Sequence, residues 1–176
     1  LHYPLRRQRQ MCIRDRSVRE QDWIVGDAMA PIAKNFSMSD LEPSLEQSKI
    51  DYTVLVQTVG VLAETPEFLD IASKHPKVAG VVGWLYLESD DITPALESHL
   101  SHPAAKHLVS IRDLAQGKDD PMWLARPDVV ANIKRLSAKG ISYDLLTHPH
   151  QLVGAIEAVK ACPDTQFILD HISKAN

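Results

Sequence analysis

Polar side chains that could do chemistry follow several short apolar runs of the sequence. The clearest case is the segment FILDHISK, in which three apolar residues are followed by Asp170 and His171. A neutral imidazole at the end of a strand could bind a metal ion or act as a general base near neutral pH. A strand-end histidine that only contacts water or a carbonyl group is the alternative. His171 is therefore the first candidate for a catalytic and metal-binding residue.

A second polar cluster lies in the segment YDLLTHPHQL, residues 143–152. His148 and His150 have H-x-H spacing, which in a strand would point both imidazoles to one side. Pro149 between them favours a loop that turns into a helix. We therefore expect one histidine to line a substrate pocket or cap that helix. Asp144 lies mid-strand, so it must face a polar barrel centre or bind a neighbouring residue, because an unpaired buried carboxylate is costly.

Three more candidates stand at strand ends. Arg112 ends the run HLVSIR and could hold a carboxylate or polarise a carbonyl through two hydrogen bonds. A pair with Asp113, or a place on the sheet rim, is the alternative. Gln57 and Trp84 end VLVQ and VVGW and are candidates for substrate contact, although Trp is also common in cores and pocket walls. We expect the histidines in helix-end or loop contexts to lie at the surface: His75, His99, His102 and His107.

Five short apolar runs alternate with helical patterns, and these elements must position the candidates. Strands buried on both faces have such near-continuous apolar runs. Their starts are 25, 29, 34 and 25 residues apart, which leaves room for one helix and two loops each time. Serial βα repetition predicts a parallel sheet with right-handed crossovers. The predicted strands are Thr53–Gln57, Val78–Leu85, His107–Arg112, Ile141–Leu146 and Gln166–His171.

The helices between these strands carry start and stop signals. Ser39 and Glu42 have capping-box spacing, and Thr65 and Thr93 each precede a proline, as an N-cap residue often does. Gly140 is a typical residue just after a helix end. Two helices show an apolar stripe that we expect to face the core: Val129, Val130, Ile133 and Leu136 in one, and Leu152, Ile156 and Val159 in the other.

The repeated βα units fit two architectures, an open doubly wound sheet and part of a (β/α)8 TIM barrel. A barrel takes about 250 residues, more than this chain holds. A doubly wound domain would be complete at this length and could be a non-catalytic ligand-binding domain. However, the sequence lacks the G-x-G-x-x-G turn and the G-x-x-x-x-G-K-[ST] loop that bind nucleotides. Pattern alone leaves both architectures open.

Composition excludes several classes of protein. At 176 residues, with 44% hydrophobic and 24% charged residues, the chain is long enough for one globular domain. No run reaches the roughly 18 apolar residues of a membrane helix, and a net charge of −4 argues against nucleic acid as the main partner. Two cysteines give neither a disulfide framework nor metal-ligand spacing. We expect a cytoplasmic protein whose oligomeric state the sequence leaves open.

Residues 1–16 differ from the rest because they carry five Arg and one Asp. No apolar stretch of a secretory signal follows them. The run RRQRQMCIRDR resembles a translated sequencing adapter, so we expect residues 1–16 to be artefactual and residues 17–176 to form the domain. A basic tail and a functional, nucleic-acid-binding arm are the alternatives.

Taken together, the segments resemble the amidohydrolase-related (amidohydrolase 2) family of metal-dependent TIM-barrel hydrolases, in its lactonase branch. That branch contains fuconolactonase-like and 2-pyrone-4,6-dicarboxylate lactonase-like enzymes. The likeness runs in family order over about residues 18–174 and favours the barrel. It is carried by these segments: DWIVGDAMAPIAKNFSMSDLEP, VLVQT, VAGVVGWLYLE, DPMWLARPDVVANIKRL, YDLLTHPHQL and FILDHISK.

The resemblance implies that a small-molecule lactone, of a sugar acid or a dicarboxylate, is hydrolysed by an activated water. It also implies a divalent metal, zinc before others, although some members need none. Its ligands would be an H-x-H pair on the first strand, a later histidine that His171 matches, and an Asp on the last strand. Arg112 matches a substrate-contacting Arg that a His usually follows. Asp113 replaces that His, which suggests a different substrate.

Two parts of the family pattern are missing from the sequence. No H-x-H precedes Val18, and no strand with the final Asp follows His171. We therefore expect an incomplete barrel of about five βα units that is itself inactive, with unpaired edges at Thr53–Gln57 and at FILDH. A metal-dependent decarboxylase of the same superfamily is the alternative enzyme.

Overall fold

The computed structural model describes residues 8–11, 19–21 and 24–174, and its centre is one parallel sheet. The strand order follows the sequence, β1-β2-β3-β4-β5-β6, without a reversal. A doubly wound sheet requires a reversal of strand order, so that alternative is wrong. The strands are β1 (Gln8–Met11), β2 (Tyr52–Val56), β3 (Val78–Gly83), β4 (Leu108–Ile111), β5 (Ser142–Leu145) and β6 (Phe167–Leu169).

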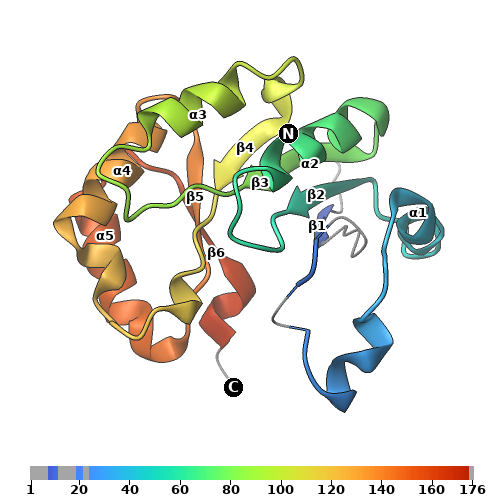
Figure 1. Cartoon of the computed structure of the whole chain (residues 1–176), viewed down its shortest axis with the longest axis horizontal. Coiled ribbons are helices and arrows are strands. Elements are labelled where there is room, and N and C mark those ends of the chain that lie inside the picture. The colour runs from blue at the N-terminus through green and yellow to red at the C-terminus, as the bar shows by residue number, and fades with distance from the viewer. Residues whose placement is uncertain (1–7, 12–18, 22–23, 175–176) are drawn as a thin grey trace, which may run out of the picture.

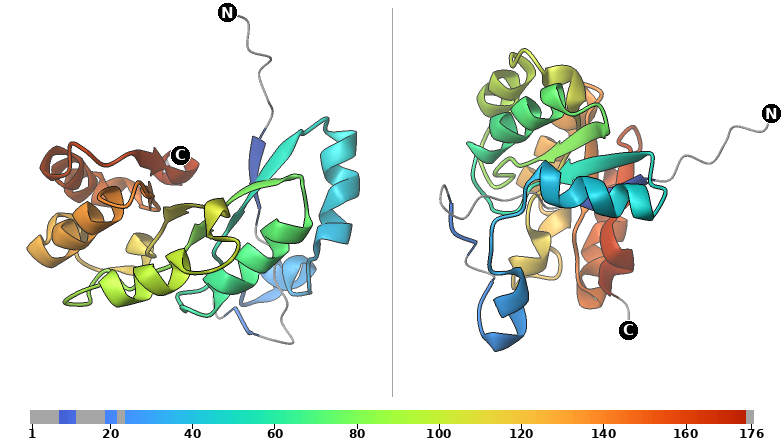
Figure 2. Two further views of the ribbon diagram at one scale, coloured as in Figure 1. Left: turned by 90° about the horizontal axis from the view of Figure 1, so that it is seen from above. Right: turned by 90° about the vertical axis from the view of Figure 1, so that its right-hand side faces the viewer.

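Helices follow one another round the outer side of the curved sheet, which stays open on one side (Figure 1). The fold is therefore an incomplete TIM barrel, as predicted. Two further views show that the short 3-10 helix η1 (Asp27–Ile32) stands away from the sheet (Figure 2). In the described ranges, no helix has the length and apolar character to cross a membrane. The α-helices are α1 (Met38–Gln47), α2 (Glu64–Lys74), α3 (Thr93–Leu100), α4 (Pro127–Ser137) and α5 (Leu152–Ala161).

Strand β1 corrects one expectation about the sheet edges. Gln8 to Met11 pair in parallel with Tyr52 to Leu55, so β2 has a partner on both sides. The expected unpaired edge at Thr53–Gln57 is therefore wrong. β1 lies within the segment expected to be artefactual, whose residues 1–7 and 12–16 fall outside the described part of the chain. Its sequence, QRQM, contains no histidine.

The two faces of the sheet have separate hydrophobic clusters. Leu55 and Val81 belong to the main core, which lies between the sheet and the helices. Val54, Val56 and Val82 form a small cluster of their own. Since successive side chains of a strand point to opposite faces, this small cluster marks the concave, inner face. Polar groups of the same face lie beyond it, at the strand ends.

Three helix starts differ from the predictions. The capping box of α1 is Ser37 with Asp40, whose carboxylate accepts the Ser37 N–H at 2.8 Å, and not Ser39 with Glu42. Thr65 lies inside the first turn of α2, where its Oγ1 accepts the Trp84 N–H at 3.0 Å. Thr93 is the first residue of α3 and not its cap. Of the three, only Thr65 is held by a residue distant in sequence, because Thr93 bonds to the nearby Asp91.

The apolar stripe of α5 also faces the other way from the prediction. Ile156 and Val159 are exposed, and the buried residues are Gly154, Ala155 and Ala158. A Cβ on Gly154 would lie 2.4 Å from the Pro121 carbonyl oxygen, so α5 approaches the chain too closely for large side chains. The stripe of α4 is as predicted, with Val129, Ile133 and Leu136 buried.

Candidate active site

The guanidinium group of Arg112 connects three strands at their carboxyl ends. Its Nη1 lies 2.6 Å from Asp170 Oδ2, just after β6, and its Nη2 donates to the Gln57 carbonyl oxygen, just after β2, at 2.8 Å. Arg112 itself follows β4, so the contacts join alternate strands. Side-chain layers inside a TIM barrel are built from alternate strands in the same way. Arg112 and Asp170 are both buried, which makes this an internal ion pair.

Two polar groups beside this ion pair have hydrogen-bonding capacity left over. The Gln57 side chain is fully buried, yet neither its Oε1 nor its Nε2 has a partner among the described residues. The Nε of Arg112 is buried and lacks a partner in the same part of the chain. Buried polar groups are nearly always hydrogen-bonded. These groups therefore need partners that the described residues do not supply, and they lie at the strand ends, where TIM-barrel active sites are built.

Asp144 is the third buried charge of the inner face. Its Oδ1 accepts a hydrogen bond from Ser110 Oγ on β4 at 2.5 Å, as expected for a mid-strand Asp that binds a neighbour. Burial raises the pKa of Asp144 to about 6, and the nearby Asp170 carboxylate adds to the rise. Ser110 and Arg112 act in the opposite direction. Asp144 can therefore gain or lose a proton near neutral pH.

This raised pKa predicts a pH-dependent stability that Asp144→Asn removes. Since the folded chain holds the proton more tightly than the unfolded chain, Asp144 disfavours folding more and more as the pH rises from about 4 through 6. Between pH 4.5 and 7.5, we expect wild type to lose about 2 kcal/mol more stability than the variant, which lacks the contribution of this carboxyl group. Urea unfolding at both pH values measures it. Equal pH dependence in wild type, Asp144→Asn and the exposed-site control Asp164→Asn would contradict the prediction.

His171 is exposed and does not join these groups. Its φ is +51°, and Ile172, Ser173 and Lys174 also have positive φ, so the chain turns in a left-handed conformation directly after Asp170. The turn directs Asp170 to Arg112, while the Ser173 hydroxyl lies 2.8 Å from that of Thr147. His171 therefore remains a candidate on sequence grounds, without a described contact to Arg112 or Asp144.

The donor groups in the described ranges do not fit the complete metal centre that the resemblance implies. No three His, Cys, Asp or Glu side chains within those ranges are grouped so that they could hold a metal ion. β1 pairs with β2 in the place of a first strand, but it carries no histidine. The single matching ligand, His171, is exposed.

His148 and His150 lie side by side where the chain passes from β5 to the next helix. Their rings are stacked, with centroids 5.8 Å apart. The His148 N–H donates to Gln151 Oε1 at 2.9 Å at the start of the 3-10 helix η5 (Pro149–Gln151). The Gln151 amide in turn donates to the carbonyl oxygens of Ala115 and Lys118. This agrees with the expectation that one of the histidines caps the helix.

Trp84 is half-buried at the end of β3 and is held on several sides. Its Nε1 donates to Asp113 Oδ1 at 3.2 Å, and its ring centroid lies 6.3 Å from that of Tyr86. His99 contradicts the expected surface position, because it is buried with Nε2 3.4 Å from the Trp84 carbonyl oxygen. Burial lowers the pKa of His99.

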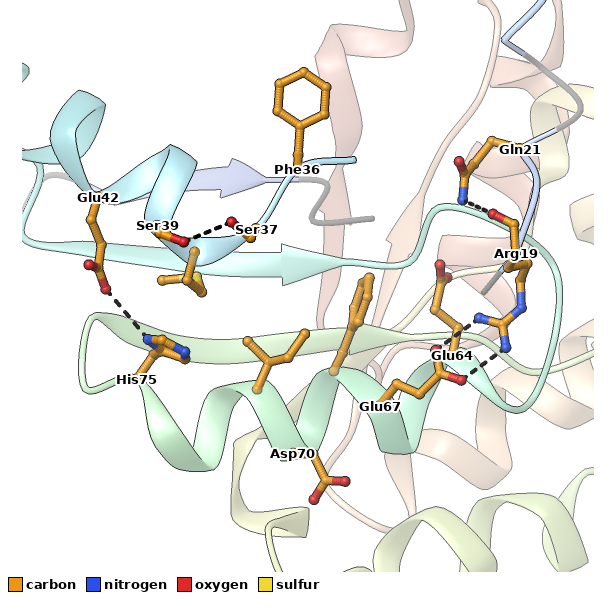
Figure 3. A pocket seen from close by; sticks show the side chains of 13 residues that line it. Arg19, Gln21, Phe36, Ser37, Ser39, Glu42, Glu64, Glu67, Asp70 and His75 are labelled. Carbon is orange, nitrogen blue, oxygen red and sulfur yellow. Dashed lines mark hydrogen bonds and ion pairs between the residues drawn. The ribbon is translucent and has the colours of Figure 1, made fainter. Parts of the chain in front are cut away.

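A cavity of about 630 Å³ lies elsewhere, between α1, α2 and residues 19–21 (Figure 3). Its floor is apolar, and ion pairs stand at its two ends: Arg19 with Glu67, and His75 with Glu42. It contains none of the strand-end residues, so the chemistry of the inner face and this cavity are separate features.

Sequence reasoning missed Asp170 as the partner of Arg112. A signal was present, because each residue follows a strand and the two side chains carry opposite charges. Nothing local joins them, since they are 58 residues apart and meet only through the curvature of the sheet. Asp113 was also missed as a buried group, because two of the three groups that donate to it, on Trp84 and Leu87, lie in another loop.

Comparisons with known proteins agree with this architecture. No family model matches the chain. L-fucono-1,5-lactonase of Burkholderia ambifaria is 31% identical over 143 residues, which is 81% of this chain and 48% of that protein. The chain thus spans about half the length of the curated relatives it matches.

Two solved structures share the fold. An amidohydrolase of Burkholderia multivorans with bound zinc has a TM-score of 0.80 and 22% identity, over 96% of this chain and 57% of the other. A probable 2-pyrone-4,6-dicarboxylic acid hydrolase of Acinetobacter baumannii with bound citric acid has a TM-score of 0.71 and 14% identity, over 98% and 60%. In sequence this chain is thus similar to an L-fucono-1,5-lactonase, and in fold it is similar to solved amidohydrolase-type structures.

Proposed function

We propose that this chain forms the substrate-binding part of a lactone hydrolase and that the 176-residue polypeptide does not itself turn over lactones. The lactonase relative supports the reaction class. The observation that carries the proposal is the group of buried, unpartnered donors and acceptors on Gln57 and Arg112 at the strand ends. The proposed lack of turnover is supported by the residues that the structure describes, since no group of three metal-binding side chains occurs among them.

The reaction converts a cyclic ester into a hydroxy acid. The oxygen of a water attacks the ester carbonyl carbon, the bond from that carbon to the ring oxygen breaks, and a proton reaches the departing ring oxygen. Arg112 and Gln57 suit the polar parts of such a substrate, because the Arg112 Nε–H and the Gln57 amide donate to carbonyl or carboxylate oxygens while Gln57 Oε1 accepts from a hydroxyl. Asp170 holds the guanidinium group in place during binding.

Gln57→Met tests the binding half of the proposal. Methionine has a similar shape but cannot make these hydrogen bonds, so we expect affinity for L-fuconate, the hydrolysis product of L-fucono-1,5-lactone, to fall about tenfold. Stability should stay unchanged or rise, since an unpartnered buried amide disfavours folding. Isothermal titration calorimetry and urea unfolding measure the two effects. The matched control is Gln151→Met, which removes a satisfied amide and should cost about 1–2 kcal/mol.

Other outcomes would overturn the proposal. If L-fuconate, a dicarboxylate and their lactones all fail to bind wild type, the substrate-binding role is wrong. Binding of aromatic carboxylates alone would favour the decarboxylase. Lactone hydrolysis by the purified polypeptide, followed with a pH indicator, would contradict the proposed lack of turnover.

A further inference from the structure

Asp113 is a buried carboxylate that binds a loop and not the inner face of the sheet. It follows Arg112, yet Arg112 turns to Asp170. The Asp113 oxygens accept three hydrogen bonds: from Trp84 Nε1 at 3.2 Å, from the Leu87 N–H at 3.1 Å and from the Leu114 N–H at 2.7 Å. Two of the donors belong to the loop between β3 and α3. One side chain of the β4 end therefore holds both ends of the segment 84–87.

The indole of Trp84 has defined contacts on its other sides as well. A Cβ on Gly60 would lie 3.2 Å from Trp84 Cε2, so the ring packs directly against the loop after β2. The backbone of Trp84 is fixed separately, by Thr65 Oγ1 at its N–H and by His99 at its carbonyl oxygen. Asp113 is thus the polar group that fixes the indole, whereas other residues fix the backbone.

The next part of the loop is tied to the same side of the molecule. Asn132 on α4 donates to the carbonyl oxygens of Leu87 and Ser89 at 2.9 and 2.7 Å. Glu88 accepts from Trp123 Nε1 at 2.9 Å. These contacts hold the outer part of the loop whether or not Asp113 is present, so the loss of Asp113 should act on residues 84–87 in particular.

We propose that Asp113 is a positioning residue that fixes the indole of Trp84 at the end of β3, between the ends of β2 and β4 that carry Gln57 and Arg112, and thereby shapes the ligand specificity of that site. This inference rests on the proposed function for its ligand, and on geometry alone for the position of Trp84. All three hydrogen bonds of Asp113 are made within the protein.

The test combines spectroscopy, exchange and binding. The Trp84 contribution to the near-ultraviolet circular dichroism is defined by the difference between wild type and Trp84→Phe. In Asp113→Ala, we expect that contribution to be lost and amide exchange of the peptide 84–87 to rise about tenfold. Asp113→Asn keeps one acceptor oxygen, so it should retain part of the signal. Gly60→Ala, which presses on the indole from the other side, should alter the same signal with Asp113 intact.

Controls separate positioning from general destabilisation. Leu45→Ala removes a buried side chain from α1 and should lower stability without changing the Trp84 signal. If Asp113→Ala and Leu45→Ala change that signal equally, or if neither the signal nor the exchange changes in Asp113→Ala and Asp113→Asn, the inference is wrong. The circular dichroism signal and the amide exchange are both measured without a ligand. If L-fuconate does not bind, the proposed function is wrong, whereas these two measurements still decide whether Asp113 positions Trp84. Where L-fuconate binds, Asp113→Ala should weaken it at least threefold.

Discussion

Replacement of Asp170 by alanine is expected to lower the free energy of unfolding by about 3–5 kcal/mol, because it leaves the buried guanidinium of Arg112 without its counter-charge. Both side chains of the pair are buried, so solvent cannot replace the lost carboxylate. Urea unfolding at pH 7.5 measures the loss. Asp164→Ala, at an exposed site before β6, is the control and should change stability by less than about 0.5 kcal/mol.

A double variant shows whether the stability loss in Asp170→Ala comes from the unpaired buried charge or only from the loss of packing. Arg112→Met with Asp170→Leu removes both charges and keeps apolar volume, so it should be more stable than Asp170→Ala alone. The explanation fails if the double variant loses at least as much stability as the single one, or if Asp164→Ala loses as much as Asp170→Ala.

Gly154→Ala is the second substitution with a large expected effect, a loss of about 3 kcal/mol. The new Cβ would lie 2.4 Å from the Pro121 carbonyl oxygen and 3.0 Å from Met122 Cα, and these are backbone atoms that cannot move aside alone. Alanine is otherwise favoured over glycine inside a helix by about 1 kcal/mol. A loss of stability in Gly154→Ala, in place of the gain expected from helix propensity, would therefore indicate that α5 lies close to the chain at Pro121.

Gly117→Ala is the matched control, because a Cβ there meets nothing within 4 Å. It should leave thermal unfolding nearly unchanged, whereas Gly154→Ala should lower the melting temperature by several degrees. A Gly154→Ala protein as stable as wild type would show that α5 does not approach Pro121 as closely as described.

The strands were predictable because a buried parallel strand leaves a strong local pattern. The run TVLVQ became Tyr52–Val56, and the run HLVSIR became Leu108–Ile111, so each strand ends one residue before its predicted polar end. The barrel was not predictable from periodicity, since curvature depends on how neighbouring strands pack. It followed from the resemblance, and the unbroken strand order agrees with it.

The site was predictable only in part, for a physical reason. A polar residue at the end of an apolar run indicates a strand-end position, and Arg112 and Gln57 lie there. The pattern does not say which way the chain turns next. At His171 the backbone turns left-handed and the imidazole is exposed, whereas Asp170 points to Arg112. Likewise, the large apolar residues of α5 predicted the buried face, but the small residues of the helix form that face. The helix lies so close to the chain at Pro121 that larger side chains do not fit between them.

The unbroken strand order has a consequence for how the chain folds. Each strand pairs with the one that precedes it in sequence, so short chain segments can join the sheet one after another and few long loops must close early. The contact of Arg112 with residues near both ends of the sheet is the exception. It can form only when β2, β4 and β6 are already in place, so this ion pair should slow unfolding and have little influence on the rate of folding.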